Sequence, residues 1–329
     1  MPRALSVRSE SWPIKGSFRI SRGARTKTDV VVVEIAEGTT IGRGECDPYP
    51  RYGESVDGVV ADIESLRSEI ADGLTREALQ NRLPAGAARN ALDCALIDFE
   101  AKRLGRPAHM LLGLPAPKPV RTAFTLSLDT PEAMGAAARA AAARSFSLLK
   151  LKVAGGDDLA RVEAVRAAAT AADLIVDANE GWSEDDLKRL TPEFARLKVG
   201  LIEQPIKAAE DEILAGFKSP VPLCADESCH TRADLSRIVG RYSHINIKLD
   251  KAGGLTEALA LAREAGTQGL RLMVGCMVST SLAMAPATLL AGRADYVDLD
   301  GPLLLDADRQ PALVYQGDLL LPPPPALWG

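Results

Sequence analysis

Residues 148–178 read LLKLKVAGGDDLARVEAVRAAATAADLIVDA and contain one strand–helix–strand unit. The apolar run 148–153 predicts a strand, the mixed alanine and charged residues of 157–172 predict a helix with one solvated face, and the final LIVDA predicts a second strand. Lys150 and Lys152 stand two residues apart on the first strand, so both side chains leave the same face of the sheet. By itself, this lysine pair is typical of a solvated edge strand.

The same alternation of strand and helix continues through the rest of the chain. The expected strands are 121–128, 148–153, 174–178, 200–204, 221–226, 244–249, 271–277 and 295–300. Helices are expected to begin at Thr130, Ser183, Thr231 and Thr256, because each of these residues suits a helix N-cap. Eight alternating units predict an α/β fold with a closed parallel barrel of the (β/α)8, or TIM, type. A doubly wound open sheet is the alternative, although no GxGxxG follows a strand.

Residues 1–113 follow a different pattern, which predicts a separate α+β domain. The β-branched run 30–34 follows the polar stretch 19–29 and is expected to form a hairpin with a second strand. We place that second strand at 39–44, a loop rich in proline and tyrosine at 46–53, and helices at 55–72 and 85–104. The predicted division is therefore an α+β domain at 1–113, a barrel at 114–303, and a tail at 304–329 that returns to the first domain as an extended segment.

Composition excludes several classes of protein. A net charge of −5, with 25% charged residues, gives no reason to expect nucleic acid or an anionic membrane as a partner. The five cysteines form no CxxC pair, which indicates reduced thiols and a cytoplasmic protein; they are Cys46, Cys94, Cys224, Cys229 and Cys276. The start at Met1 leads into charged residues without an apolar signal-peptide region. Residues 272–292 carry no charge, but Pro286 and neighbouring polar residues favour a buried strand and helix over a membrane span.

Three successive predicted strands each end in a carboxylate. These residues are Asp177, Glu203 and Asp226, and in a barrel the carboxyl ends of the strands surround the active site. One such acid alone is more often a helix cap or a surface charge. Three oxygen ligands without a nearby histidine suit a hard divalent cation, and Mg2+ is the cation that we expect.

Two lysines are predicted to face each other across the mouth of the barrel. Lys152 ends the second strand and Lys248 ends the sixth, and these strands are four positions apart in a ring of eight. A carboxylate substrate bound to the metal would then have its α-carbon between two amines. Desolvation and neighbouring cations are expected to lower the lysine pKa to about 7–8, so that one lysine can remove the α-proton. The metal would stabilise the enediolate, and the second lysine would return a proton to the opposite face.

Longer stretches of this sequence resemble the enolase superfamily, in its muconate-lactonizing subgroup, and in particular the dipeptide epimerases that act on L-Ala-D/L-Glu in murein-peptide metabolism. The similarity runs over nearly the whole chain. The stretches that carry it are ECDPYPRYGES (45–55), LPAGAARNALDCAL (83–96), LIVDANEGW (174–182), CADESCHTR (224–232), NIKLDKAGGLTEALALA (246–262) and DLDGP (298–302).

The resemblance implies a modified (β/α)7β barrel with an α+β capping domain whose mobile loops close over the site. It implies one Mg2+ per subunit on Asp177, Glu203 and Asp226, with Lys152 and Lys248 as the two acid/base catalysts. It further implies a set of substrate-binding residues. Lys150 would lie near the substrate carboxylate, Thr125 would contact the substrate, Asp298 and Asp300 would hold the ammonium of the N-terminal residue, and Arg25 would meet the glutamate side chain. Arg19 and Arg22 compete with Arg25 for that last role.

We therefore expect a cytoplasmic, Mg2+-dependent dipeptide epimerase whose partner is a small dipeptide. A competing hypothesis is a cycloisomerase or o-succinylbenzoate synthase of the same superfamily. Asp298 and Asp300 argue against it, because they would repel a substrate without a cationic amine. A Schiff-base lyase that uses Lys248 and a small-molecule binding protein without catalytic activity are two further hypotheses. The sequence does not decide whether the chain forms a homo-oligomer, nor the range of dipeptides accepted.

Overall fold

Eight parallel strands form the central sheet, as expected. The computed structural model describes residues 2–329. Met1 lies outside them; it is the first residue of the expected α+β domain and of the start that was expected to carry no signal peptide. The strands are β5 (Phe124–Leu126), β6 (Leu148–Lys152), β7 (Asp173–Asp177), β8 (Val199–Glu203), β9 (Leu223–Ala225), β10 (His244–Ile247), β11 (Arg271–Gly275) and β12 (Tyr296–Asp298). They are paired in sequence order, and the Ala123 amide donates to the Val297 carbonyl at 2.7 Å, which joins the first strand to the last. The sheet is therefore a closed barrel, not an open doubly wound sheet.

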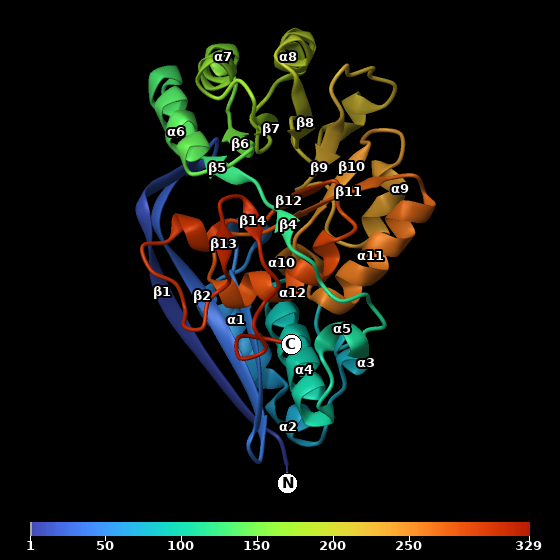
Figure 1. Cartoon of the computed structure of the whole chain (residues 1–329). Coiled ribbons are helices and arrows are strands. Elements are labelled where there is room, and N and C mark those ends of the chain that lie inside the picture. The colour runs from blue at the N-terminus through green and yellow to red at the C-terminus, as the bar shows by residue number, and fades with distance from the viewer. Residues whose placement is uncertain (1) are drawn as a thin grey trace.

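Helices cover the outside of this barrel (Figure 1). They are α6 (Pro131–Ala143), α7 (Asp158–Ala168), α8 (Glu184–Arg196), α9 (Leu235–Ile238), α10 (Leu249–Ala252), α11 (Leu255–Thr267) and α12 (Ser281–Ala291). Short 3-10 helices lie at η2 (Asp211–Leu214), η3 (Arg232–Asp234) and η4 (Gly301–Leu304). Because β12 is followed by η4 and not by an α-helix, the barrel has the modified form that the family resemblance implied.

Most of the predicted helix starts are correct. The Thr130 hydroxyl accepts the Ala133 amide, and Ser183 and Thr231 each form a reciprocal capping box with an aspartate three residues later. The start at Thr256 was wrong, because α11 begins one residue earlier with Gly254 as its N-cap. Gly254 lies against the Asp93 side chain, which leaves no space for a larger cap there.

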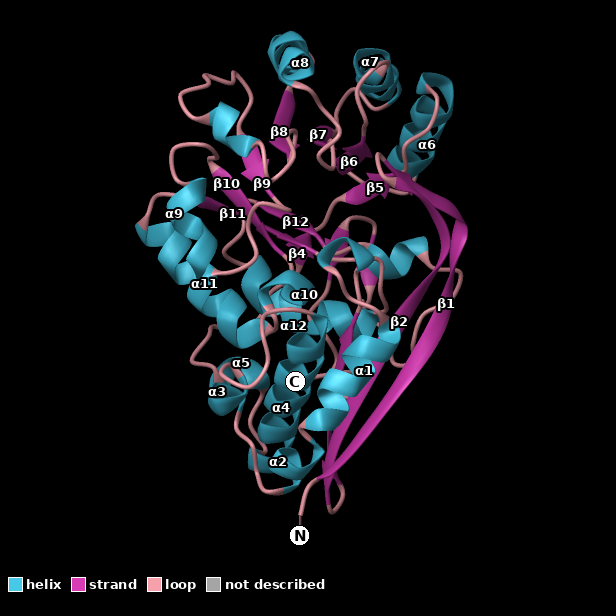
Figure 2. Cartoon of the chain, turned by 180° about the vertical axis from the view of Figure 1, so that it is seen from behind, coloured by secondary structure: helices cyan, strands magenta, loops and turns pink. Residues whose placement is uncertain are grey.

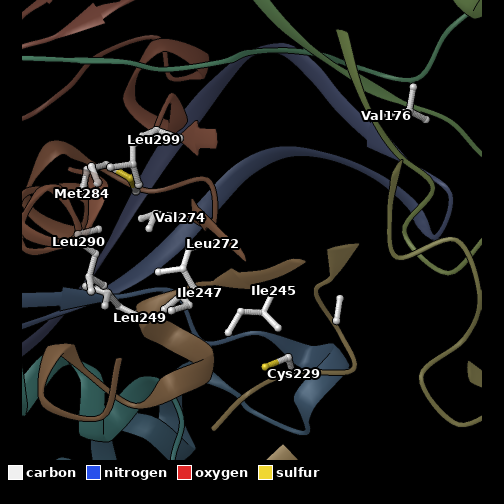
Figure 3. Packing of buried hydrophobic residues seen from close by; sticks show 14 of the residues in the cluster. Val176, Cys229, Ile245, Ile247, Leu249, Leu272, Val274, Met284, Leu290 and Leu299 are labelled. Carbon is white, nitrogen blue, oxygen red and sulfur yellow. The ribbon is translucent and has the colours of Figure 1, made fainter. Parts of the chain in front are cut away.

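The alternation of side chains on each strand separates two cores. Leu148 of β6 points into the barrel, where it packs with Ile175, Leu201 and Met273. Leu149 and Leu151 point outward to the helices. Figure 3 shows the outer core around β10, β11 and α12, where Ile245, Ile247, Leu272 and Val274 gather near Met284 and Leu290. Lys150 and Lys152 share the inward face with Leu148, so these two charges lie inside the barrel and not on a solvated edge.

The first domain contains one more long strand than expected. Its sheet is an antiparallel meander of β1 (Ala4–Ile20), β2 (Gly23–Glu37) and β3 (Thr40–Cys46), and the two long strands reach up to the barrel in Figure 2. The helices are α1 (Val56–Ser65), α2 (Arg67–Ala71), α3 (Arg76–Leu79), α4 (Ala87–Leu104) and α5 (Ala108–Leu111), with the 3-10 helix η1 (Pro50–Tyr52) in the predicted loop. The polar stretch before residue 30 is therefore mostly strand. Its side chains are largely exposed, which hides the strand from a search for apolar alternation.

The last residues return to the first domain, but not only as an extended segment. A short hairpin, β13 (Tyr315–Gln316) and β14 (Leu319–Leu320), pairs with β4 (Val120–Arg121), so the start of the first predicted barrel strand belongs to this small sheet. The Trp328 indole then donates to the Cys94 carbonyl of α4 at 3.0 Å. Among the helices of residues 2–329, none has the length and apolar character that crossing a membrane requires. The uncharged stretch 272–292 forms β11 and α12, as expected.

Candidate active site

The capping domain and the barrel together line a cavity at the carboxyl ends of the strands. From the capping domain come Phe18, Ile20, Arg22, Arg25, Tyr49 and Tyr52. From the barrel come Thr125, Lys150, Lys152, Asn179, Asp226, Glu227, Lys248, Cys276, Met277, Val278, Asp298, Asp300, Gly301 and Leu304. Most of the residues singled out from the sequence therefore meet in one cavity, although they lie up to 275 positions apart, from Arg25 to Asp300.

The three predicted metal ligands converge beneath this cavity. Asp177 ends β7, Glu203 ends β8 and Asp226 follows β9, so parallel pairing of adjacent strands brings their carboxylates together. One oxygen from each lies within 4.8 Å of the others, and all three residues are buried. The register pairs Asp177 directly with Glu203. Three buried carboxylates at this separation repel one another strongly unless cations compensate them.

Lysine side chains supply part of that compensation. The Lys152 ammonium lies 2.6 Å from Asp177, and the Lys248 ammonium lies 2.7 Å from Asp226. Lys150 lies 2.7 Å from Glu203 and 3.2 Å from Asp177. Because β6 and β10 are four positions apart in the strand order, Lys152 and Lys248 approach the acids from opposite sides of the ring.

The protein's own groups raise the pKa of two lysines, Lys248 and Lys150. Burial lowers the pKa of Lys248, but the charges of Asp226 and Glu203 outweigh burial and raise it well above its usual value. Burial also lowers the pKa of Lys150, and there Asp298 leads the carboxylates that raise it. The lowering that we expected includes the charge of a cation bound to the carboxylates, which would oppose this rise.

Two residues that sequence reasoning missed hold the acids in place. Lys251 is buried and donates to the backbone carbonyls of Asp226, Cys229 and Asn246, while its ammonium lies 2.6 Å from the Asp226 carboxylate. The Asn246 side-chain amide donates to the Glu203 carboxylate at 2.6 Å. Asn246 stands two residues before Lys248, so the same period of two that placed the other lysines could have identified it.

Asp298 and Asp300 lie next to Thr125, and Asp298 is already paired with a lysine. The Asp300 carboxylate accepts the Thr125 amide at 2.6 Å, and the Thr125 hydroxyl donates to Asp298 at 3.3 Å. Lys150 lies 2.7 Å from Asp298 and also 2.7 Å from Glu203, so it joins this pair to the carboxylate cluster. Burial and the neighbouring Asp298 raise the pKa of Asp300 to about 7. The two acids therefore carry less net negative charge than the sequence suggested.

The hairpin between β1 and β2 places two arginines over the cavity. Arg25 lies on β2, opposite Phe18 of β1. Arg22 lies in the turn, where it donates to the Asn179 carbonyl at 2.8 Å and lies 2.8 Å from Glu227 and 3.3 Å from Glu180. Arg25 forms a 3.3 Å ion pair with Asp47. Arg22 is thus bound to the barrel loops, whereas Arg25 keeps more of its donors for a ligand.

Aromatic side chains form the remaining wall. Tyr49 and Tyr52, from the loop after β3, line the cavity, and Tyr52 packs edge-on against His230 with ring centroids 4.5 Å apart. His230 is close to this wall but does not join the acidic cluster. Trp182 packs in the core, where its indole donates to Asp158 at 2.8 Å.

Both halves of the chain match known sequence families. Residues 3–113 match the family described as mandelate racemase / muconate lactonizing enzyme, N-terminal domain, and residues 133–324 match the family described as enolase C-terminal domain-like. The chain is 48% identical to the L-Ala-D/L-Glu epimerase of Escherichia coli over 95% of this chain and 98% of that protein. It is 47% identical to an N-acetyl-D-glutamate racemase of a Pseudoalteromonas species, over 91% and 95% of the two chains.

The fold of this chain also matches solved structures of related proteins. An enolase family member from Agrobacterium tumefaciens, described as homologous to dipeptide epimerases and bound to sodium and L-Ala-L-Glu, superposes with a TM-score of 0.97 at 52% identity over the whole of both chains. A dipeptide epimerase from Enterococcus faecalis, complexed with Mg and L-Leu-L-Tyr, superposes with a TM-score of 0.91 at 30% identity over 98% of both chains.

Proposed function

The chain belongs to the enolase superfamily, in the mandelate racemase and muconate lactonizing enzyme family, and we propose that this epimerase inverts the C-terminal residue of dipeptides, with L-Ala-D/L-Glu as its substrate. The observation that carries this proposal is the arrangement of Lys152 and Lys248 on opposite strands around three converged carboxylates. A binding protein has no need for two opposed bases. The high identity to an L-Ala-D/L-Glu epimerase supports the same substrate.

We propose that Asp177, Glu203 and Asp226 hold one Mg2+ per subunit. The fit rests on the ligand set, which consists of carboxylate oxygens within 4.8 Å of one another. One oxygen of Glu203 and one of Asp226 accept no hydrogen bond, although each lies within ion-pair distance of a lysine. When bound, the cation would polarise the substrate carboxylate and so acidify its α-proton.

The lysines would carry the proton. In the proposed 1,1-proton transfer, the neutral amine of one lysine takes the α-proton, and the ammonium of the other returns a proton to the opposite face. Lys150 would pair with the substrate carboxylate, since it already lies between the carboxylate cluster and Asp298. The positive charge of Lys150 would stabilise the enediolate as it forms.

Recognition of the two ends of the dipeptide would fall to different walls of the cavity. Asp298 and Asp300, with Thr125 beside them, would hold the ammonium of the N-terminal residue. Arg25 would meet the side-chain carboxylate of the C-terminal glutamate. We favour Arg25 over Arg22 because Arg22 is already held by two buried carboxylates of the barrel loops. We further propose that the enzyme acts in the cytoplasm on murein-derived peptides.

Exchange of the α-proton with solvent tests this function directly. L-Ala-L-Glu incubated in D2O with enzyme and Mg2+ should gain deuterium at the glutamate α-carbon and form L-Ala-D-Glu, as measured by mass spectrometry and NMR. A chelator should stop the exchange, and added Mg2+ should restore it. If L-Ala-L-Glu and every other L-Ala-L-Xaa dipeptide fail to exchange, the epimerase assignment is wrong.

A second candidate is racemisation of an N-acylated glutamate. The observation that favours it is the Lys150–Asp298 ion pair at 2.7 Å, which neutralises one of the acids that would otherwise repel an acyl group in the place of an ammonium. The 47% identity to an N-acetyl-D-glutamate racemase points the same way. Incubation of N-acetyl-D-glutamate under the same conditions decides between them, because a dipeptide-specific enzyme should exchange it far more slowly than L-Ala-L-Glu.

A further inference from the structure

Asp47, in the loop after β3, is a buried carboxylate that faces the arginine on the cavity wall. Its side chain is 2% exposed, and one of its oxygens lies 3.3 Å from the Arg25 guanidinium. The Arg25 side chain is 31% exposed and lines the cavity. The guanidinium also lies 5.9 Å from the ring centroid of Tyr49. The positive charge of Arg25 is thus partly compensated by the protein itself.

Other acids surround Asp47. The Asp47 amide donates to the Asp250 carboxylate of α10 at 3.2 Å. Burial raises the pKa of Asp47 to about 6, Arg25 opposes that rise, and Glu54 and Glu45 add to it. Asp47 is therefore mostly ionised at neutral pH, and a substrate carboxylate that binds Arg25 also feels its negative charge. A substrate with an uncharged side-chain amide of the same shape is not repelled in this way.

We propose, resting on the proposed function in which Arg25 meets the C-terminal side chain, that Asp47 determines specificity: its charge offsets that of Arg25 and limits the preference for glutamate over an uncharged side chain. The alternative role for Asp47 is to hold Arg25 in place. A single 3.3 Å contact is a weak restraint on a guanidinium that also packs near Tyr49. Repulsion between two carboxylates that share one arginine is the larger effect.

The test compares two substrates of the same shape, L-Ala-L-Glu and L-Ala-L-Gln, in wild type, Asp47→Asn and Asp47→Glu. Asp47→Asn should raise the ratio of kcat/KM for Glu over Gln by roughly tenfold, through a lower KM for the acidic substrate. Asp47→Glu keeps the charge and should keep the ratio near wild type. If Asp47→Asn does not fold, Asp47→Ser removes the same charge with a smaller side chain.

Asp211 provides a matched control outside the cavity. It is equally buried, at 2%, and pairs with one arginine, Arg241, at 2.7 Å. Asp211→Asn should leave the Glu to Gln ratio unchanged. A ratio that stays within twofold of wild type in the uncharged Asp47 variants, or that falls, overturns the proposal. Failure of wild type to act on either dipeptide would instead contradict the proposed function, and an unchanged ratio in Arg25→Ala would remove Arg25 from the side-chain site.

Discussion

At the scale of single residues, Lys152 and Lys248 have equivalent carboxylate partners, and Lys152 also lies near an aromatic ring of the capping domain. Each ammonium is paired with one buried carboxylate, Asp177 or Asp226. The Lys152 ammonium also lies 5.8 Å from the ring centroid of Phe18, which belongs to the capping domain. In the proposed mechanism, proton transfer at Lys152 would take place beside an aromatic side chain of the capping domain.

We predict that Lys152→Ala and Lys248→Ala each abolish epimerisation, with a loss of at least about 1000-fold in kcat, because inversion needs a proton donor on the face opposite the base. Each variant should still exchange the α-proton of one epimer, and the two variants should act on opposite epimers. Deuterium incorporation into L-Ala-L-Glu and L-Ala-D-Glu, followed separately, measures this. Substantial epimerisation by either variant would refute the two-base mechanism.

At the scale of elements, the close contact between β3 and α4 decides how the capping domain is built. A Cβ added at Gly44 would lie 2.0 Å from the Ala91 carbonyl oxygen and 2.9 Å from the Ala95 amide. Both are backbone atoms of one helix, so the strand and the helix would have to separate. The same element continues into the loop that carries Asp47 and Tyr49, and its position therefore affects the cavity wall.

We predict that Gly44→Ala lowers the free energy of unfolding by about 2–3 kcal/mol, because the new methyl group overpacks a contact between two backbones. Gly266→Ala is the control. Gly266 lies in α11, nothing lies within 4 Å of its added Cβ, and alanine there should stabilise the helix by about 0.5–1 kcal/mol. Urea denaturation measures both values. Equal effects of the two substitutions would show that the β3–α4 contact yields easily.

At the scale of the whole molecule, one arginine from the tail joins the capping domain to the barrel. Arg309 lies 2.6 Å from Glu45 of β3 and 2.6 Å from Glu10 of β1. Glu45 is fully buried and also accepts the amide and the hydroxyl of Thr280, the N-cap of α12. Three parts of the chain that are far apart in sequence meet in this network.

We predict that Arg309→Ala destabilises the protein by about 3 kcal/mol, because it leaves the Glu45 carboxylate buried without its cation. Arg196→Ala is the control, since Arg196 also contacts two glutamates, Glu163 and Glu193, but is 59% exposed. That change should cost much less stability, because solvent screens an exposed ion pair. Thermal and urea unfolding compare the two variants. A loss in Arg309→Ala no greater than in Arg196→Ala would contradict a role in joining the domains.

The amino-acid sequence by itself determined the barrel and the chemistry at its mouth. The period of two in Leu148–Lys152 placed two lysines on the inward face, and the strand–helix repeat placed Asp177, Glu203 and Asp226 at the ends of adjacent strands. Both are local patterns, because they follow from the spacing of residues within one element or one β/α unit.

Only the tertiary structure decided which charges meet. The strand β1, the position of Arg25 on β2, the Lys150–Asp298 pair and the partners of Arg22 and Arg309 could not be predicted from spacing. The β1–β2 hairpin is local, but its exposed polar side chains give no apolar alternation. The ion pairs join residues that lie far apart in the chain, where no periodicity relates the two partners. The charge that each group carries in the site depends on those contacts, because burial and the nearest ions together set its pKa.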